Sequence, residues 1–218
     1  MSDDLRQRLS KMRRSYGEEG LVDDQLPSEP FALFSNWLTE AASNPYIVEP
    51  NAMVLGTSDI SARTVLLKDV TEGRFTFFTN YNSRKSRAIT TDGRISLLFP
   101  WYPMERQVIV LGIASRATEE ESDLYFASRP YGSQIGAWAS EQSEPLQSRE
   151  ELENRYQELS ARFSEGAVPR PPHWGGFTVK PESIEFWQGR YSRLHDRIRY
   201  TCDDLHQGQI WKWVRLNP

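Results

Sequence analysis

The sequence predicts a mainly β domain with helices packed on its outside, which is an α+β fold. Two groups of short β-rich runs carry this prediction, one between residues 52 and 115 and one after residue 174. Most connections within the first group are too short for the crossovers that parallel strands need. Helical patterns lie before, between and beside these groups, so we expect an antiparallel β-barrel with helices outside it.

Length and composition favour one folded domain. A chain of 218 residues can bury a sizeable core. Its hydrophobic share of 38% is low, but an aromatic share of 12%, with seven tryptophans, argues against disorder. Residues 1–27 are polar and charged, so we expect a mobile N-terminal arm followed by a single domain over residues 28–218.

Charge and cysteine content exclude several classes of function. A net charge of −4 with scattered basic residues does not fit a nucleic-acid binder. No stretch approaches the roughly 18 apolar residues of a membrane span. A single cysteine, Cys202, and three histidines make a disulfide impossible within the chain and a metal site unexpected. These features predict a cytoplasmic protein without a metal, a nucleic-acid partner or a membrane.

The first elements follow from turn and stop signals. An amphipathic helix is expected from Pro30 until Asn44 and Pro45 stop it, with Phe34 and Trp37 on its apolar side. Five strands are then expected, in the runs "AMVLGTS", "ARTVLLKDV", "RFTFFTN", "RISLLFPW" and "RQVIVLGIAS".

Helices separate these strands from the later ones. Thr118 and Glu121 form a capping box for a helix that ends near Arg129, and a second short helix can begin at Ser133. Ser148 opens a third helix, whose buried stripe comprises Leu152, Tyr156, Leu159 and Phe163. The last four strands are expected in "GGFTVKP", "SIEFWQ", "DRIRYTC" and "QIWKWVRL".

Two basic segments suggest an anion site. No glycine-rich phosphate loop is present, so side chains and helix ends would have to hold any phosphate. "NSRKSRA" places Arg84 and Lys85 behind the cap candidate Ser83, where cations oppose the helix dipole and indicate an anion. A solvated basic turn explains the same residues, as solvated strand ends would explain Arg63 and Lys68 in "RTVLLK".

A phosphate cradle is suggested by "LYFASRPYGSQIGAW". Tyr125 and Arg129 lie one helical turn apart, and Ser133 can cap the next helix. Alternatively, Arg129 only donates hydrogen bonds to the free carbonyl groups at the end of its own helix.

"RLHDR" is the densest polar cluster of the chain. An extended conformation would place Arg193, His195 and Arg197 on one face of a strand, where two guanidinium groups beside an imidazole favour an anion. A structural role for the histidine is the alternative. Trp187 in "EFWQG" offers a flat surface for a ring, although core packing explains it as well.

Taken together and in order, these segments resemble the pyridoxine/pyridoxamine 5′-phosphate oxidase family. The resemblance runs from "RRSY" through "FFTNYNSRKSRAI", "SRPYGSQIGAW", "IEFWQG" and "RLHDR" to "WVRLNP". It implies an FMN-binding split β-barrel that works as a homodimer, with FMN in clefts between the subunits. The hairpin "TSDISART" is shorter than in the family, and Phe78 stands where tyrosine is common.

The resemblance also implies residue roles. Contacts to FMN fall on Arg63, Thr64, Val65, Leu66, Leu67, Lys68, Phe78, Thr79, Arg84, Lys85, Gln107, Gln142, Ser143, Trp187 and Arg197. Contacts to substrate fall on Arg13, Arg14, Ser15, Tyr16, Lys68, Tyr125, Arg129, Ser133, Arg193, Leu194 and His195, with Arg193 and His195 as catalytic residues.

The implied reaction oxidises the 4′ carbon of pyridoxine or pyridoxamine 5′-phosphate to give pyridoxal 5′-phosphate. Hydride passes to the flavin, which O2 reoxidises with release of hydrogen peroxide, and His195 is a candidate proton acceptor. A split-barrel flavoenzyme with another substrate would have no need of "RLHDR" or of the phosphate cradle. A non-catalytic module that binds flavin or pyridoxal phosphate is the rival of a different class.

Overall fold

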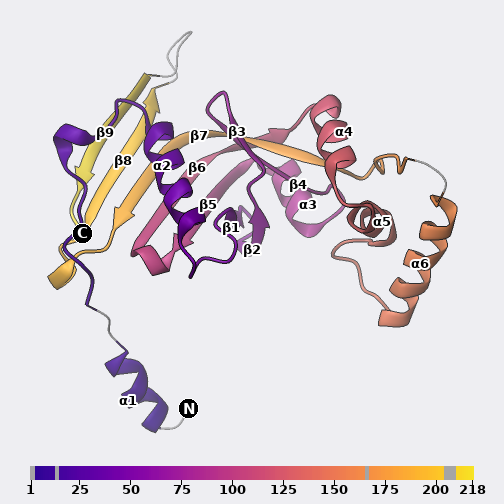
Figure 1. Cartoon of the computed structure of the whole chain (residues 1–218), viewed down its shortest axis with the longest axis horizontal. Coiled ribbons are helices and arrows are strands. Elements are labelled where there is room, and N and C mark those ends of the chain that lie inside the picture. Colours follow the sequence, from indigo (N-terminus) through magenta and orange to yellow (C-terminus); the bar gives the residue numbers. More distant parts are fainter. Residues whose placement is uncertain (1–2, 13–14, 165–166, 204–209) are drawn as a thin grey trace. The chain divides into compact units, whose positions relative to one another are not determined.

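The computed structural model describes residues 3–12, 15–164, 167–203 and 210–218, and its strands join in one antiparallel sheet (Figure 1). The helices are α1 (Asp3–Lys11), α2 (Pro30–Ser43), α3 (Arg84–Thr91), α4 (Glu119–Ser128), α5 (Tyr131–Ala139) and α6 (Arg149–Arg162), with the 3-10 turns η1 (Asp23–Gln25), η2 (Tyr102–Met104) and η3 (Tyr191–Arg193). The strands are β1 (Ala52–Thr57), β2 (Ser61–Leu66), β3 (Asp69–Thr71), β4 (Arg74–Asn80), β5 (Arg94–Trp101), β6 (Arg106–Arg116), β7 (Trp174–Gln188), β8 (Asp196–Asp203) and β9 (Ile210–Leu216).

The hydrogen-bonded strand order is β2-β1-β5-β6-β7-β4-β3, with β8 between β7 and β9. The tight β1–β2 hairpin pairs Thr57 with Ser61, and β4 pairs with β7 so that Phe78 faces Gly176. The pairs β1–β2, β1–β5, β3–β4, β4–β7, β7–β8 and β8–β9 are all antiparallel, as the short connections predict.

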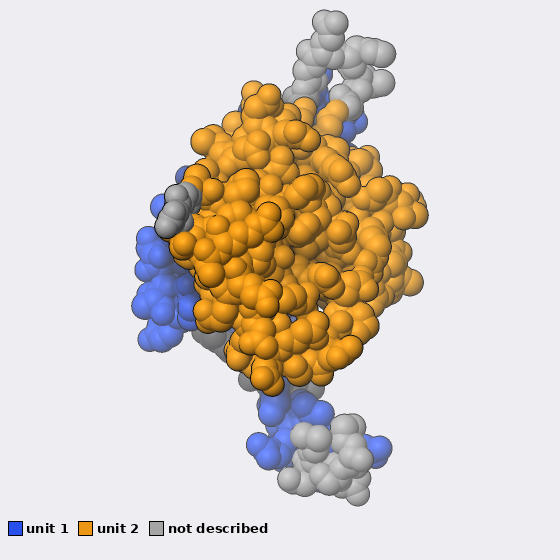
Figure 2. All heavy atoms as spheres, turned by 90° about the vertical axis from the view of Figure 1, so that its right-hand side faces the viewer, with its two compact units in different colours: residues 1–50, 100–109, 183–218 blue, residues 51–99, 110–182 orange. Residues whose placement is uncertain are grey.

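Two compact units divide the chain (Figure 2). Unit 1 comprises residues 1–50, 100–109 and 183–218, and unit 2 comprises residues 51–99 and 110–182. Strands β5, β6 and β7 therefore contribute residues to both units. The division into an arm over residues 1–27 and one domain over 28–218 stays a prediction.

Unit 1 has an aromatic core beside helix α2. Pro30 begins this helix, as predicted, and Phe34 and Trp37 are buried on one side of it. The Trp37 ring meets Phe186 of β7 edge-on at 5.3 Å between centroids. Because buried aromatic side chains contribute most of the transfer free energy in a small core, this contact ties α2 to the sheet residues of unit 1.

Unit 2 has two apolar clusters. Phe75, Phe77 and Phe177 are fully or almost fully buried within its sheet. Beside the helices, Phe126, Ile135 and Trp174 belong to a second cluster, against which side chains of α6 pack.

Local signals predicted several helix ends. The capping box is present, since Glu121 N donates to Thr118 Oγ1 and Thr118 N donates to Glu121 Oε2. Ser148 caps α6 through Glu151 N. The stripe on α6 is only half-buried, because it covers the edge of a cluster instead of entering a core.

Three local predictions were wrong. Helix α5 begins at Tyr131, so Ser133 lies inside its first turn and its N–H donates to Pro130 O. Ser83 occupies the N-cap position of α3 without a side-chain cap bond. The runs "GGFTVKP" and "SIEFWQ" form one strand, β7, because Pro181 does not interrupt it.

Among the helices of the described residues, none has the length and hydrophobicity needed to cross a membrane.

A glycine pair tests the packing of unit 2. A Cβ at Gly112 of β6 would lie 2.3 Å from Lys180 O, whereas a Cβ at Gly136 of α5 would meet nothing within 4 Å. We expect Gly112→Ala to lower the free energy of unfolding by about 1–3 kcal/mol through overpacking. Gly136→Ala should raise it by up to about 1 kcal/mol through helix propensity. Thermal unfolding checks both, and equal effects of the two changes would contradict the packing described.

Candidate functional site

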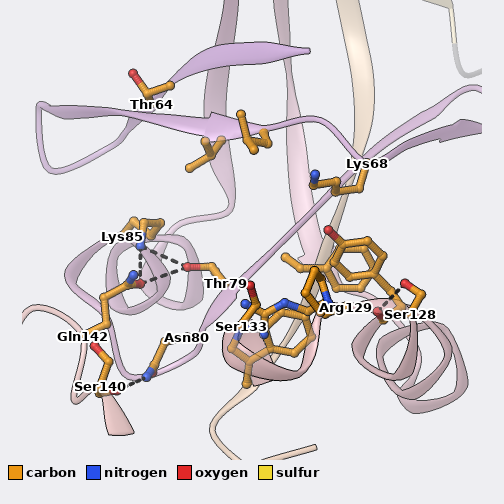
Figure 3. A pocket seen from close by; sticks show the side chains of 16 residues that line it. Thr64, Lys68, Thr79, Asn80, Lys85, Ser128, Arg129, Ser133, Ser140 and Gln142 are labelled. Atoms are coloured by element: carbon orange, nitrogen blue, oxygen red, sulfur yellow. Dashed lines mark hydrogen bonds between the residues drawn. The ribbon is translucent and has the colours of Figure 1, made fainter. Parts of the chain in front are cut away.

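A pocket of about 530 Å³ lies in unit 2, among strands β2 and β4 and helices α3, α4 and α5 (Figure 3). Its volume suits a small-molecule ligand. Of the predicted residues, the structure brings together Thr64, Val65, Leu66, Lys68, Phe78, Thr79, Lys85, Tyr125, Arg129, Ser133 and Gln142. Figure 3 shows two polar ends, one around Lys85 and Gln142 and one around Lys68, Arg129 and Ser133.

Lys85 is the buried cation at the first end. Its Nζ donates to Gln142 Oε1 at 2.7 Å, to Thr79 Oγ1 at 3.0 Å and to Ser83 Oγ at 3.1 Å. All three acceptors are neutral, and no described carboxylate pairs with this ammonium. Burial, and then the nearby charge of Arg63, lowers the pKa of Lys85 to about 8. A buried cation without a counter-ion indicates a place for an anion.

The β1–β2 hairpin holds the cations beside Lys85. Asp59 Oδ1 accepts from Thr57 Oγ1 at 2.6 Å, and Asp59 Oδ2 pairs with Arg84 Nε at 3.0 Å. Hydrogen bonds from Ser61 and Thr57 hold the pKa of Asp59 far below its usual range. Arg63 donates from Nη1 to Thr57 Oγ1 at 2.8 Å. Asp59 was missed from the sequence because its partner Arg84 is 25 residues away.

Gln142 and Ser143 reach helix α3 from their own chain. Ser143 Oγ accepts from Arg84 N at 3.1 Å, so it satisfies one of the free backbone N–H groups at the start of α3. Ser143 is held with φ at 78°, a conformation that costs free energy in a residue other than glycine.

Arg129 marks the second end of the pocket. Its guanidinium lies 4.7 Å from the centroid of the Trp174 ring, and its Nη1 is buried without a hydrogen-bond partner among the described residues. An unpaired buried donor costs about 1–3 kcal/mol, and more when it is charged. Burial lowers the pKa of Arg129. The orphaned donor therefore indicates an anionic ligand.

Flat rings form the wall of the pocket. Phe78 stacks on Tyr125 at 4.1 Å between centroids and on Trp174 at 5.6 Å, and Lys68 Nζ lies 5.9 Å from the Tyr125 centroid. No role was predicted for five of the lining residues, namely Asn80, Ser128, Pro130, Ser140 and Trp174. Trp174 stands in the motif "WGGF", which was the available signal.

A second cleft, of about 520 Å³, lies in unit 1 and is lined in part by Ser15, Tyr16, Arg193 and His195. The expectation that "RLHDR" is extended was wrong for its first half, because β8 begins only at Asp196. Ser192 and Arg193 instead have φ at 54° and 63°. Such left-handed pairs store strain and recur at functional sites.

His195 is oriented from both sides. Its Nδ1 accepts the backbone N–H of Arg190 at 3.0 Å, so a neutral ring carries its proton on Nε2. Its ring lies 4.7 Å from that of Trp187 and 5.5 Å from that of Tyr16, between centroids. Burial, and then the charge of Arg193, lowers the pKa of His195. The lowered pKa favours the neutral ring, which can donate a hydrogen bond from Nε2–H.

The other predicted residues lie outside both linings. In unit 2 these are Arg63, Leu67, Arg84 and Ser143, and in unit 1 they are Gln107, Trp187, Leu194 and Arg197. Arg197 Nε donates to the buried Glu185 Oε1 at 2.9 Å. Arg13 and Arg14 lie outside the described residues. No group of three or more His, Cys, Asp or Glu side chains in the described ranges could hold a metal ion.

Solved structures share the fold. PhzG from Burkholderia lata, solved in complex with tetrahydrophenazine-1-carboxylic acid, is 34% identical with a TM-score of 0.84, over 93% of this chain and 100% of that one. An FMN binding protein of Nostoc punctiforme, related to pyridoxamine 5′-phosphate oxidase, is 13% identical with a TM-score of 0.68, over 89% and 99%. The predicted α+β split-barrel fold is thereby confirmed.

Sequence comparisons cover the whole chain. The family model "Pyridoxamine 5'-phosphate oxidase" matches residues 39–163, and "Pyridoxine 5'-phosphate oxidase C-terminal dimerisation region" matches residues 174–218. A pyridoxine/pyridoxamine 5′-phosphate oxidase of Rubrobacter xylanophilus is 53% identical over 100% of both chains, and one of Streptomyces avermitilis is 47% identical over 95% of each. The chain therefore belongs to the pyridoxine/pyridoxamine 5′-phosphate oxidase family.

Proposed function

We propose that this protein oxidises pyridoxine or pyridoxamine 5′-phosphate to pyridoxal 5′-phosphate, with FMN as cofactor and O2 as acceptor, as a homodimer. The orphaned Nη1 of Arg129 carries the proposal, because it calls for an anion in a pocket walled by flat rings. A phosphorylated pyridine has both features. Full-length identity of 53% to a curated oxidase of this name supports the same substrate.

The residues present fit FMN. Its phosphate would be held by Lys85 and Arg84, since Lys85 is a buried ammonium with neutral partners only and Arg84 lies in the first turn of α3. Thr64, Val65 and Leu66 line the pocket beside it and would contact the ring system. When bound, FMN supplies a ring that accepts hydride and that O2 reoxidises with release of hydrogen peroxide.

Substrate is positioned by its phosphate. In the proposal, Arg129, Lys68, Tyr125 and Ser133 hold that group, and the aromatic wall orients the pyridine ring. Such positioning removes much of the entropic barrier when the reacting atoms are held about 3–3.5 Å apart.

By the family resemblance, the substrate ring would also meet Arg193 and His195, which line the separate cleft of unit 1. His195 donates from Nε2, because Nδ1 is engaged by Arg190 N–H. It can accept a proton from substrate only if that bond is given up, so its geometry favours the donor role over the role of base. Arg193 adds a fixed positive charge that can stabilise electron density on the ring.

Peroxide release tests the function. The purified protein should be yellow, should bleach when pyridoxine 5′-phosphate is added without air, and should release one hydrogen peroxide per pyridoxal 5′-phosphate in air. Arg129→Met should keep its flavin and lose substrate affinity by about tenfold to a hundredfold, the value of a charge-assisted hydrogen bond. A yellow protein that neither bleaches nor makes peroxide is a binding module, and the proposal fails.

The pKa of Lys85 predicts how FMN binding depends on pH. The flavin phosphate stays dianionic above pH 7, whereas Lys85 loses its proton near pH 8 in the free protein. The affinity should be constant between pH 7 and the Lys85 pKa and fall above it, by at most about tenfold per pH unit. Lys85→Met should bind weakly at all pH values. Arg84→Ala, whose lost group does not titrate, should bind weakly but keep the pH dependence; flavin titrations without that dependence would contradict the assignment.

Changes at Arg193 and His195 should spare the flavin. Arg193→Ala and His195→Gln should keep the yellow spectrum and lower kcat/KM by about tenfold to a hundredfold or more. Arg193→Lys should not restore activity fully, because an ammonium does not replace a planar fork. If these residues are merely solvated, the cost stays within about 0.5 kcal/mol, and wild-type kcat/KM in both variants would end this part of the proposal.

A further inference from the structure

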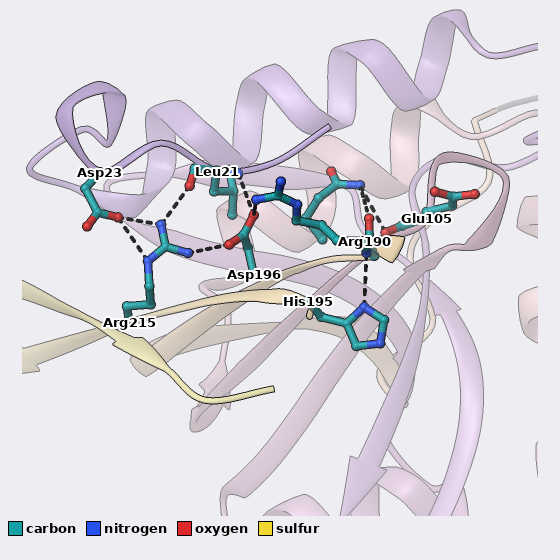
Figure 4. A network of polar contacts seen from close by, with 9 residues as sticks. Leu21, Asp23, Glu105, Arg190, His195, Asp196 and Arg215 are labelled. Atoms are coloured by element: carbon teal, nitrogen blue, oxygen red, sulfur yellow. Dashed lines mark hydrogen bonds and ion pairs between the residues drawn. The ribbon is translucent and has the colours of Figure 1, made fainter. Parts of the chain in front are cut away.

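Asp196 is a buried carboxylate next to His195, and three separate segments of unit 1 meet on it (Figure 4). Its Oδ2 accepts from Leu21 N at 2.9 Å and pairs with Arg190 Nη1 at 3.4 Å, while its Oδ1 pairs with Arg215 Nη1. Breaking such a buried pair is costly, because it leaves an uncompensated charge. Asp196 thus joins the N-terminal segment, the loop that bears His195 and strand β9.

Arg215 extends this junction along the N-terminal segment. Its Nε donates to Asp23 Oδ1 at 3.0 Å, and its Nη2 donates to Leu21 O at 2.7 Å. Negative and positive side chains alternate in this network, in the order Asp23, Arg215, Asp196 and Arg190, and their formal charges sum to zero. We call these four side chains the Asp196 clasp.

The main chain of the N-terminal segment lies directly against the clasp. A Cβ added at Gly20 would lie 2.7 Å from Asp196 Oδ2 and 2.8 Å from Arg190 Nη1. Both distances are shorter than a real Cβ keeps from another non-hydrogen atom. Both atoms are held by the ion pairs, so neither can move aside without loosening them. By contrast, a Cβ at Gly17 would make only an ordinary contact of 3.7 Å with Glu105 Oε2.

The clasp is connected to His195 through two residues. Arg190 gives its guanidinium to Asp196 and its backbone N–H to His195 Nδ1. Tyr16, five residues before Leu21, presents its ring edge-on to that of His195.

We propose that Asp196 and Arg215 are positioning residues. The clasp holds residues 16–23, with the Tyr16 ring against His195, and keeps Arg190 N–H on Nδ1, so that His195 presents Nε2–H to substrate. This role rests on the proposed function, because only there does His195 meet substrate. A loosened clasp lowers the fraction of molecules in which Tyr16 and Arg190 hold His195 in this way, and saturating substrate restores that fraction. KM should therefore rise while kcat changes little.

Steady-state kinetics on the flavin-loaded enzyme tests whether KM rises while kcat stays nearly the same. Arg215→Met removes the hydrogen bonds of Arg215 to Asp196, Asp23 and Leu21. One charge-assisted hydrogen bond is worth about tenfold or more in affinity, so this variant should raise KM for pyridoxine 5′-phosphate at least about tenfold. Asp23→Asn, at an exposed position, should raise it less. Lys212→Met is the matched control, since Lys212 lies on the same strand and pairs with Asp203 at 2.7 Å, away from the clasp. If Arg215→Met and Asp23→Asn have the same KM as the control Lys212→Met, the proposal is overturned.

A second pair of variants leaves every charge in place. Gly20→Ala should raise KM and Gly17→Ala should not, although both lose the same backbone freedom in the unfolded chain. Equal KM values for the two would also overturn the proposal.

Nitrogen NMR of ¹⁵N-histidine-labelled, flavin-loaded protein gives a readout without turnover. The chain has three histidines, and His195→Gln assigns the resonance. The wild type should show a proton on Nε2 and none on Nδ1, and Arg215→Met and Gly20→Ala should show averaging between the two tautomers. An unchanged tautomer in both variants overturns the clasp. If the wild type does not oxidise pyridoxine 5′-phosphate but the tautomer shifts, the clasp stands and the proposed function fails.

Discussion

The pocket of unit 2 is organised by positive charge that the protein does not neutralise. Lys85 is buried among neutral oxygens, and Arg129 keeps a buried N–H without a partner. Elsewhere in the same unit, basic side chains form ion pairs with carboxylates, as in the exposed pairs Arg87–Glu144 and Arg94–Asp92. Desolvated cations are expensive to fold around, so their presence at both ends of one pocket indicates that anionic ligands complete it.

Aromatic packing determines what lies between the two charged ends. Phe78 and Trp174 lie on the neighbouring strands β4 and β7, and helix α4 adds Tyr125, so three stacked rings make the wall. Planar walls favour planar ligands through stacking and apolar burial. A flat ring carrying a phosphate combines both demands, and this agreement links the fold to the chemistry of the family.

In unit 1, the main structural feature is a strained loop that precedes β8. Ser192 and Arg193 adopt left-handed conformations just before β8, and such conformations persist only where surrounding contacts over-determine them. The Asp196 clasp and the Arg190–His195 hydrogen bond supply those contacts. The Arg190 N–H on Nδ1 also leaves the proton of a neutral His195 ring on Nε2, so the loop backbone and the tautomer depend on the same hydrogen bond.

Interactions between near neighbours were determined by the sequence itself. The capping box at Thr118 and the start of α2 at Pro30 depend on residues a few positions apart, so patterns revealed them. The motifs also included eleven of the residues that line the pocket, because the family resemblance carries roles by position, but Trp174 and four other lining residues received no role. Only the tertiary structure decided contacts between distant residues: Gln142 on Lys85, 57 residues apart, and Asp23 on Arg215, 192 apart. It also decided that Arg193 and His195 leave the strand, since left-handed backbone at two ordinary residues follows from surrounding contacts and not from local preference.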